Sequence, residues 1–91
     1  MPLYTYIATY KGQSHVVGQH RRSNYRGFAI SMVGRMPDGA LPSLTKMLRT
    51  EMIDKVLRSE WVAIDGCKNV WRTQCDVRGS VFELYSVQTQ D

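Results

Sequence analysis

The first quarter of the chain has the residue pattern of an antiparallel hairpin. Residues 3–10 are almost wholly β-branched or aromatic, residues 11–13 supply turn residues, and residues 14–21 resume the strand pattern. We predict a hairpin in which Tyr10 faces Ser14. On the core face, this register pairs Ala8 with Val16, Tyr6 with Gly18 and Tyr4 with His20. On a half-wet face, it pairs Thr9 with His15, Ile7 with Val17, Thr5 with Gln19 and Leu3 with Arg21.

The spacing of the apolar residues in residues 24–36 fits either a helix or a strand. Their apolar side chains recur at helical spacing after Ser23, which can act as an N-cap, yet several of them also alternate as in a strand. Gly27 and Gly34 weaken the helix, because each costs about 1 kcal/mol relative to Ala in a helix interior. The pattern favours a helix, with a strand as the alternative.

Residues 43–59 have the clearest helical pattern of the chain. The pairs Glu51–Lys55 and Asp54–Arg58 place an acid before a base at the favourable spacing. The charges balance, which favours a helix packed on a core over one lying on a membrane surface. Its expected apolar face consists of Leu44, Met47, Leu48, Met52, Ile53, Val56 and Leu57.

The remainder of the chain returns to strand patterns. We expect strands at residues 61–64, 70–77 and 80–88, separated by turns at Asp65-Gly66 and Arg78-Gly79. The last turn pairs Cys75 with Phe82, Thr73 with Leu84 and Trp71 with Ser86 on an apolar face, and leaves polar residues on the other. This alternation is typical of a sheet that is covered on one face only.

Together these elements predict an α+β fold in a single small domain covering residues 1–91. An N-terminal hairpin and a C-terminal three-stranded meander form an antiparallel sheet, with one or two helices on one face, in the order β-β-α-(α)-β-β-β. The chain has neither a long apolar run nor a visible secretory signal, so we expect a cytoplasmic protein without membrane contact, compact in the manner of small bacterial or phage proteins.

The charge of the chain is unevenly distributed. The net charge is +4, but residues 1–37 contain five bases and no acid, whereas residues 38–91 contain seven bases and all eight acids. Within the basic part, Gln19 to Gly27 places three arginines among Ser, Asn and Tyr side chains that can contact a phosphate backbone or stack on a base. If Ser23 caps a helix, the positive helix end lies there as well. The predicted polyanion-binding residues are Lys11, His20, Arg21, Arg22, Arg26 and Arg35.

Catalytic and metal-binding patterns are absent from the sequence. Cys67 and Cys75 are not spaced as zinc or redox pairs, and His15 and His20 fall on opposite faces of a regular strand. No cofactor, metal or catalytic residue is predicted. Either histidine beside the arginines could still act as the base of a metal-free, ribonuclease-like enzyme.

These observations favour a small basic binding module that contacts a polyanion, nucleic acid first, through residues 11–35. The arginines could also be merely solvated residues at a hairpin end. A second function is a protein-interaction or inhibitor module that docks an acidic protein surface, or forms a homodimer through a sheet edge. Its expected exposed apolar patch comprises Ile7, Val17, Val70, Val81 and Val87. The ribonuclease-like enzyme using His15 or His20 is the third.

Overall fold

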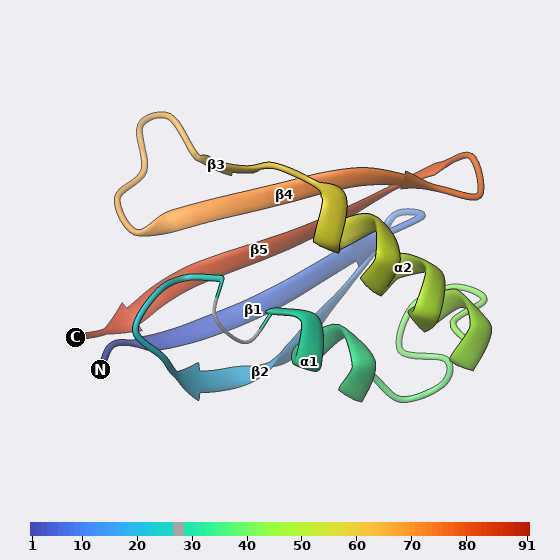
Figure 1. Ribbon diagram of the computed structural model, residues 1–91, viewed down its shortest axis with the longest axis horizontal. Coiled ribbons are helices and arrows are strands. Elements are labelled where there is room, and N and C mark those ends of the chain that lie inside the picture. The colour runs from blue at the N-terminus through green and yellow to red at the C-terminus, as the bar shows by residue number, and fades with distance from the viewer. Residues whose placement is uncertain (27–28) are drawn as a thin grey trace.

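The computed structural model describes residues 1–26 and 29–91. These residues form a five-stranded antiparallel sheet and two helices (Figure 1). The order β-β-α-α-β-β-β is the α+β arrangement predicted from the sequence. Along the chain the elements are β1 (Leu3–Tyr10), β2 (Gln13–Arg21), α1 (Ala29–Arg35), α2 (Lys46–Arg58), β3 (Trp61–Ala63), β4 (Val70–Val77) and β5 (Ser80–Gln90).

The strands lie in the order β2-β1-β5-β4-β3, so the first and last strands of the chain are neighbours in the middle of the sheet. Both helices cover the same face, α1 over β2 and β1, and α2 over β4. Tyr6 and Ala8 of β1, Leu84 of β5 and Met52 of α2 are fully buried between the two layers. Neither helix covers the opposite face, which we call the open face (Figure 1).

The hairpin of β1 and β2 follows the predicted register in only half of its length. The pairs from Tyr6–Gly18 to Leu3–Arg21 are confirmed. Near the turn the predicted pairs are wrong by one residue, because Lys11 and Gly12 form a two-residue turn with positive φ at both positions. Tyr10 therefore faces Gln13, and the observed pairs nearest the turn are Thr9–Ser14, Ala8–His15 and Ile7–Val16.

Val17 is the extra residue of a β-bulge, and it accounts for the one-residue shift in register between the two halves of this hairpin. It stands between the paired residues Val16 and Gly18 without a partner on β1. Its side chain packs against the core, so the prediction that Val17 belongs to an exposed apolar patch is wrong. The bulge places Val16 on the open face instead, where 62% of its surface is exposed.

The first helix is shorter than its sequence pattern indicates. α1 begins at Ala29, so Ser23 is not its N-cap, and Gly27 lies outside the described residues. In the preceding loop, the side chain of Asn24 accepts a hydrogen bond from the backbone N–H of Arg26 at 3.0 Å. This Asx turn bends the chain away from β2. The described helix therefore begins after Arg26 and not at Ser23, as was expected.

The second helix is confirmed, but it starts later and ends one residue earlier than predicted, and its apolar face is narrower. Thr45 is the N-cap, and its hydroxyl accepts a hydrogen bond from the Leu48 backbone N–H at 3.3 Å. Leu48, Met52 and Val56 are buried, but Met47 and Leu57 are 71% and 66% exposed, so their assignment to the core face is wrong.

The C-terminal strands agree with their predicted register. Cys75 pairs with Phe82 and Trp71 with Ser86, around a two-residue turn at Arg78 and Gly79. β3 is short, and pairs with β4 at three positions from Trp61 to Ala63. The predicted meander therefore forms one half of the sheet, and β5 joins it to β1.

Candidate functional site

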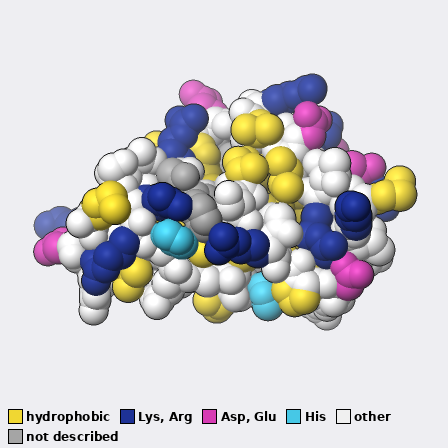
Figure 2. All heavy atoms as spheres, turned by 60° about the horizontal axis from the view of Figure 1, so that its bottom comes forward, with side chains coloured by type: hydrophobic (Ala, Val, Ile, Leu, Met, Phe, Trp, Pro, Cys, Tyr) yellow, Lys and Arg dark blue, Asp and Glu magenta, His cyan; other side chains and the backbone are white. Residues whose placement is uncertain are grey.

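One long side of the molecule is formed by the edge strand β2, its turns and α1. We call this side the basic flank. Residues 1–37, which supply it, contain no acid. Figure 2 shows several Lys and Arg side chains and both histidines on this side, with the acidic side chains toward its margins. The basic flank comprises Lys11, His15, His20, Arg21, Arg22 and Arg35.

The bulge at Val17 changes where the histidines lie. His15 faces Ala8 and His20 faces Tyr4, and both partners point into the core, so both imidazoles lie on the helix-covered side of β2. The expectation that they occupy opposite faces is wrong. Their partners are four residues apart on β1, which corresponds to roughly 13 Å along a strand. The two imidazoles therefore cannot act together on one phosphodiester.

Lys11 and Arg21 mark the two ends of the flank. Lys11 lies in the turn before β2, with its Nζ 5.4 Å from the centroid of the Tyr10 ring. Arg21 is the last residue of β2, eight positions beyond Gln13, at a distance of roughly 27 Å along an extended strand. The basic residues are therefore spread along an edge and do not form one compact cluster.

Arg21 is held in place by the ends of the neighbouring strands. Its Nη1 donates to the carbonyl oxygens of Met1 at 2.8 Å and Asp91 at 3.3 Å, and its Nη2 donates to the side-chain oxygen of Gln90 at 2.9 Å. The guanidinium remains exposed. Arg21 thus contributes a fixed positive charge to the flank while it ties β2 to β5.

Arg22 and Arg35 complete the flank at the two ends of the segment that follows β2. Arg22 is half-buried, and its backbone N–H donates to the carbonyl of Pro2 at 3.1 Å. Arg35 is the exposed last residue of α1. A base at this position is also favourable for the helix, because the C-terminal end of a helix carries a partial negative charge.

Arg26 lies elsewhere, although it is close to Arg21 and Arg22 in sequence. It lines a small hollow of about 130 Å³ together with Val56 and Leu57 of α2 and Trp61 of β3. β3 is the edge strand opposite β2, so the loop after β2 carries Arg26 across the covered face. The structure therefore divides the three arginines of the sequence run between two sides of the molecule.

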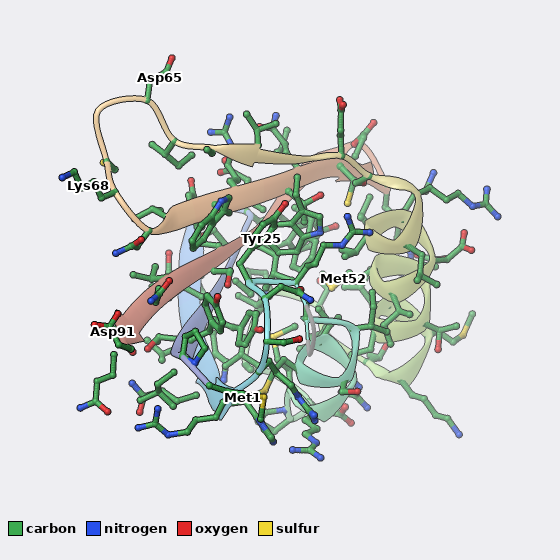
Figure 3. All side chains as sticks on the ribbon, turned by 60° about the vertical axis from the view of Figure 1, so that its left-hand side comes forward. Met1, Tyr25, Met52, Asp65, Lys68 and Asp91 are labelled. Carbon is green, nitrogen blue, oxygen red and sulfur yellow. The ribbon has the colours of Figure 1, made fainter. Side chains whose placement is uncertain are left out.

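Tyr25 fixes this loop to the sheet. Its ring stacks on Trp71 with centroids 4.5 Å apart and planes at 7°, and it contacts Trp61 edge-on at 5.6 Å. Its carbonyl accepts a hydrogen bond from the Ser86 hydroxyl at 2.6 Å. Figure 3 shows Tyr25 over the sheet, on the side that also carries Met52. One face of the ring predicted to stack on a base is thus occupied by Trp71.

The arginines of residues 38–91 are all paired with acids of the same half of the chain. Arg78 contacts Glu51 at 2.7 Å, and this carboxylate raises the pKa of the exposed guanidinium, mainly through the hydrogen bond. The predicted pair of Asp54 and Arg58 is present at 3.2 Å, whereas Glu51 binds Arg78 in place of the expected Lys55. Further ion pairs join Arg49 to Asp38 and Arg72 to Glu83.

The described residues offer little for metal or thiol chemistry. They contain no group of three or more His, Cys, Asp or Glu side chains placed to hold a metal ion. Cys67 is exposed and Cys75 is half-buried, and neither forms a disulfide. No helix among residues 1–26 and 29–91 is long and apolar enough to span a bilayer. No protein-family model, curated protein or solved structure matches this chain.

Proposed function

We propose that this protein binds an extended polyanion, with nucleic acid as the first candidate, along the basic flank. The observation that carries the proposal is the separation of charge in the fold. The acid-free segment supplies the flank, whereas arginines of the second half are paired with acids. An approaching polyanion therefore meets an excess of positive charge on one side of the molecule.

The spacing of the bases favours a long partner over a small anion. Lys11 and Arg21 lie at opposite ends of β2, so a single phosphate can contact only one of them. A nucleic-acid strand has a charge at every nucleotide and can follow the edge from one end to the other. Each phosphate that is contacted releases counterions, so affinity falls with salt by a slope of about 0.7 per contact for a single strand.

Arg26 has a different place in this proposal from the one its sequence neighbours imply. It lies across the covered face, next to Trp61 and Leu57. A strand that follows β2 cannot contact Arg26 and Lys11 along the same line. We therefore assign the polyanion to Lys11, His20, Arg21, Arg22 and Arg35, with His15 added by the bulge, and expect Arg26 to contribute only long-range charge.

Binding of labelled single-stranded DNA, single-stranded RNA and duplex DNA across a salt series tests the proposal. We expect association at low ionic strength and a linear decrease of the logarithm of the binding constant with the logarithm of salt concentration. Removing two flank charges with Lys11→Gln and Arg35→Gln should reduce the salt slope by roughly 1.4 for a single strand, because two phosphate contacts are lost.

The matched control removes two charges elsewhere. Lys55 of α2 and Lys68 of the β3–β4 loop are exposed, and Figure 3 shows Lys68 on a loop far from Met1. The double variant Lys55→Gln, Lys68→Gln has the same net charge as the flank variant and should keep the wild-type salt slope. The proposal fails if no nucleic acid associates at low salt, or if the control variant loses as much affinity as the flank variant.

A further inference from the structure

The open face of the sheet carries apolar side chains on every strand, with the Arg72–Glu83 ion pair among them. One cross-strand row runs over all five strands as Val16, Ile7, Tyr85, Arg72 and Val62. The next row contains Thr5, Val87 and Val70, and Val81 lies nearer the β4–β5 turn. Val16 of β2, Val62 of β3 and Val81 of β5 are 62%, 52% and 49% exposed. Exposed apolar surface that is rimmed by polar residues can mark a contact site.

The charged side chains of this face cancel one another. Arg72 and Arg21, the latter at the corner that this face shares with the basic flank, are matched in number by Asp76 and Glu83, so the face is neutral on a protein of net charge +4. Near its centre, Glu83 accepts a hydrogen bond from the Tyr85 hydroxyl at 3.1 Å and contacts Arg72 at 3.5 Å. This carboxylate already has partners of its own. A covering partner would therefore not leave it unpaired.

The neutral charge of the open face favours a second copy of the chain over a polyanion as its partner. A polyanion gains nothing from a neutral surface with Glu83 near its centre. A second copy of the chain presents the same neutral apolar face, so the net positive charges of the two copies can stay on the flanks. Pairing through the edge of β2 would instead bring Lys11 of one copy toward Arg21 of the other, since two-fold related edge strands run antiparallel.

The size of the face agrees with a weak dimer. Four strands of at least eight residues, about 4.8 Å apart, together with the three-residue β3, form a surface of roughly 20 by 27 Å. Two copies packed face to face would therefore bury roughly 1,000 Å², which is the lower limit for a specific interface. We propose that two copies of this chain associate through their open faces, with the sheets packed against each other.

Two substitutions should disrupt this contact without destabilising the fold of the single copy. Val81→Lys places a base opposite Asp76, and Val62→Glu places an acid opposite Arg72, so both create favourable cross-strand pairs. The double variant keeps the net charge and leaves the flank unchanged. Its matched control, Met47→Lys with Leu57→Glu, makes the same chemical changes on exposed apolar residues of α2.

Molar mass, measured by sedimentation equilibrium from micromolar to near-millimolar protein, tests the proposal. The wild type and the α2 control should approach twice the monomer mass, also at high salt, while Val62→Glu, Val81→Lys stays monomeric with an unchanged circular dichroism spectrum. A monomeric wild type, a dimeric double variant or a monomeric control each overturns the proposal.

A second measurement requires only the wild-type chain and holds even if the double variant does not fold. On dilution, the methyl resonances of Val16, Val62 and Val81 should shift together, while those of Met47 and Leu57 stay in place. Shifts confined to α2, or no shifts, contradict the open face as the contact. Because this measurement uses the protein without nucleic acid, the outcome is independent of whether nucleic acid binds.

Discussion

Gly18 determines the path of β2 more than any other residue of the hairpin. Its φ is +153°, and a Cβ at this position would lie 3.3 Å from the Cε of Met32 in α1. The glycine thus permits both the bulge at Val17 and the close approach of the helix. A glycine inside a strand pattern is a known sign of a bulge. This sign could have predicted that His15 and His20 lie on one side.

We expect Gly18→Ala to destabilise the protein by about 1 to 3 kcal/mol, because the new side chain meets both a strained backbone and the Met32 side chain. Chemical denaturation measures the free energy of unfolding. Gly34→Ala is the control, since its Cβ would make only an ordinary 3.5 Å contact with Ile53 and Ala is the better helix former by up to about 1 kcal/mol. Equal losses for the two variants would contradict the assignment.

The two thiols should differ in reactivity. Burial raises the pKa of the Cys75 thiol above its ordinary value, so at mildly alkaline pH less of it is the reactive thiolate, and its position on β4 also limits access. Cys67 is exposed on the β3–β4 loop. We expect iodoacetamide to modify Cys67 first, as followed by peptide mass spectrometry. Faster labelling of Cys75 would show that β4 is more open than described.

The secondary-structure elements were predictable where a pattern repeats, and less so at their ends. The alternation in residues 70–88 gave the register of β4 and β5, because a two-residue turn leaves one arrangement of the apolar face. The register of β1 and β2 was predicted correctly only from Gly18 to Arg21. Nearer the turn it was wrong, because the bulge adds one residue to β2 and the composition of the strand does not reveal where. α2 was recognised by its period, but its start depends on one hydroxyl, that of Thr45.

Thr45→Ala should destabilise α2 by about 1 kcal/mol, because the Leu48 N–H would lose its capping acceptor. The same substitution at Thr50 is the control. Thr50 lies inside the helix and its hydroxyl donates to the Lys46 carbonyl, so Thr50→Ala should be neutral or slightly stabilising. Thermal unfolding, followed at a helix-sensitive wavelength, distinguishes the two. A larger loss for Thr50→Ala would mean that Thr45 is not the cap.

At the scale of the whole molecule, the sequence predicted the positive charge of the basic flank but not which arginines lie on it. Charge counts along the chain were sufficient to find an acid-free segment, because the fold keeps much of that segment along β2 and α1. Proximity in sequence failed for Arg26, because Tyr25 stacks on Trp71 and carries the loop across the sheet. That stacking partner is distant in the chain, and no local pattern indicates it.

The central pairing of β1 with β5 also has a consequence for folding. These strands lie at opposite ends of the chain, so the bonds that join the two halves of the sheet close a loop of nearly the whole sequence. Local hairpins such as β1–β2 and β4–β5 can form early. Joining them first loses the conformational entropy of the long loop between β1 and β5, and the contacts that compensate for this loss form only afterwards. Folding should therefore be slow for so small a protein, with the joining of β1 and β5 as its last large step.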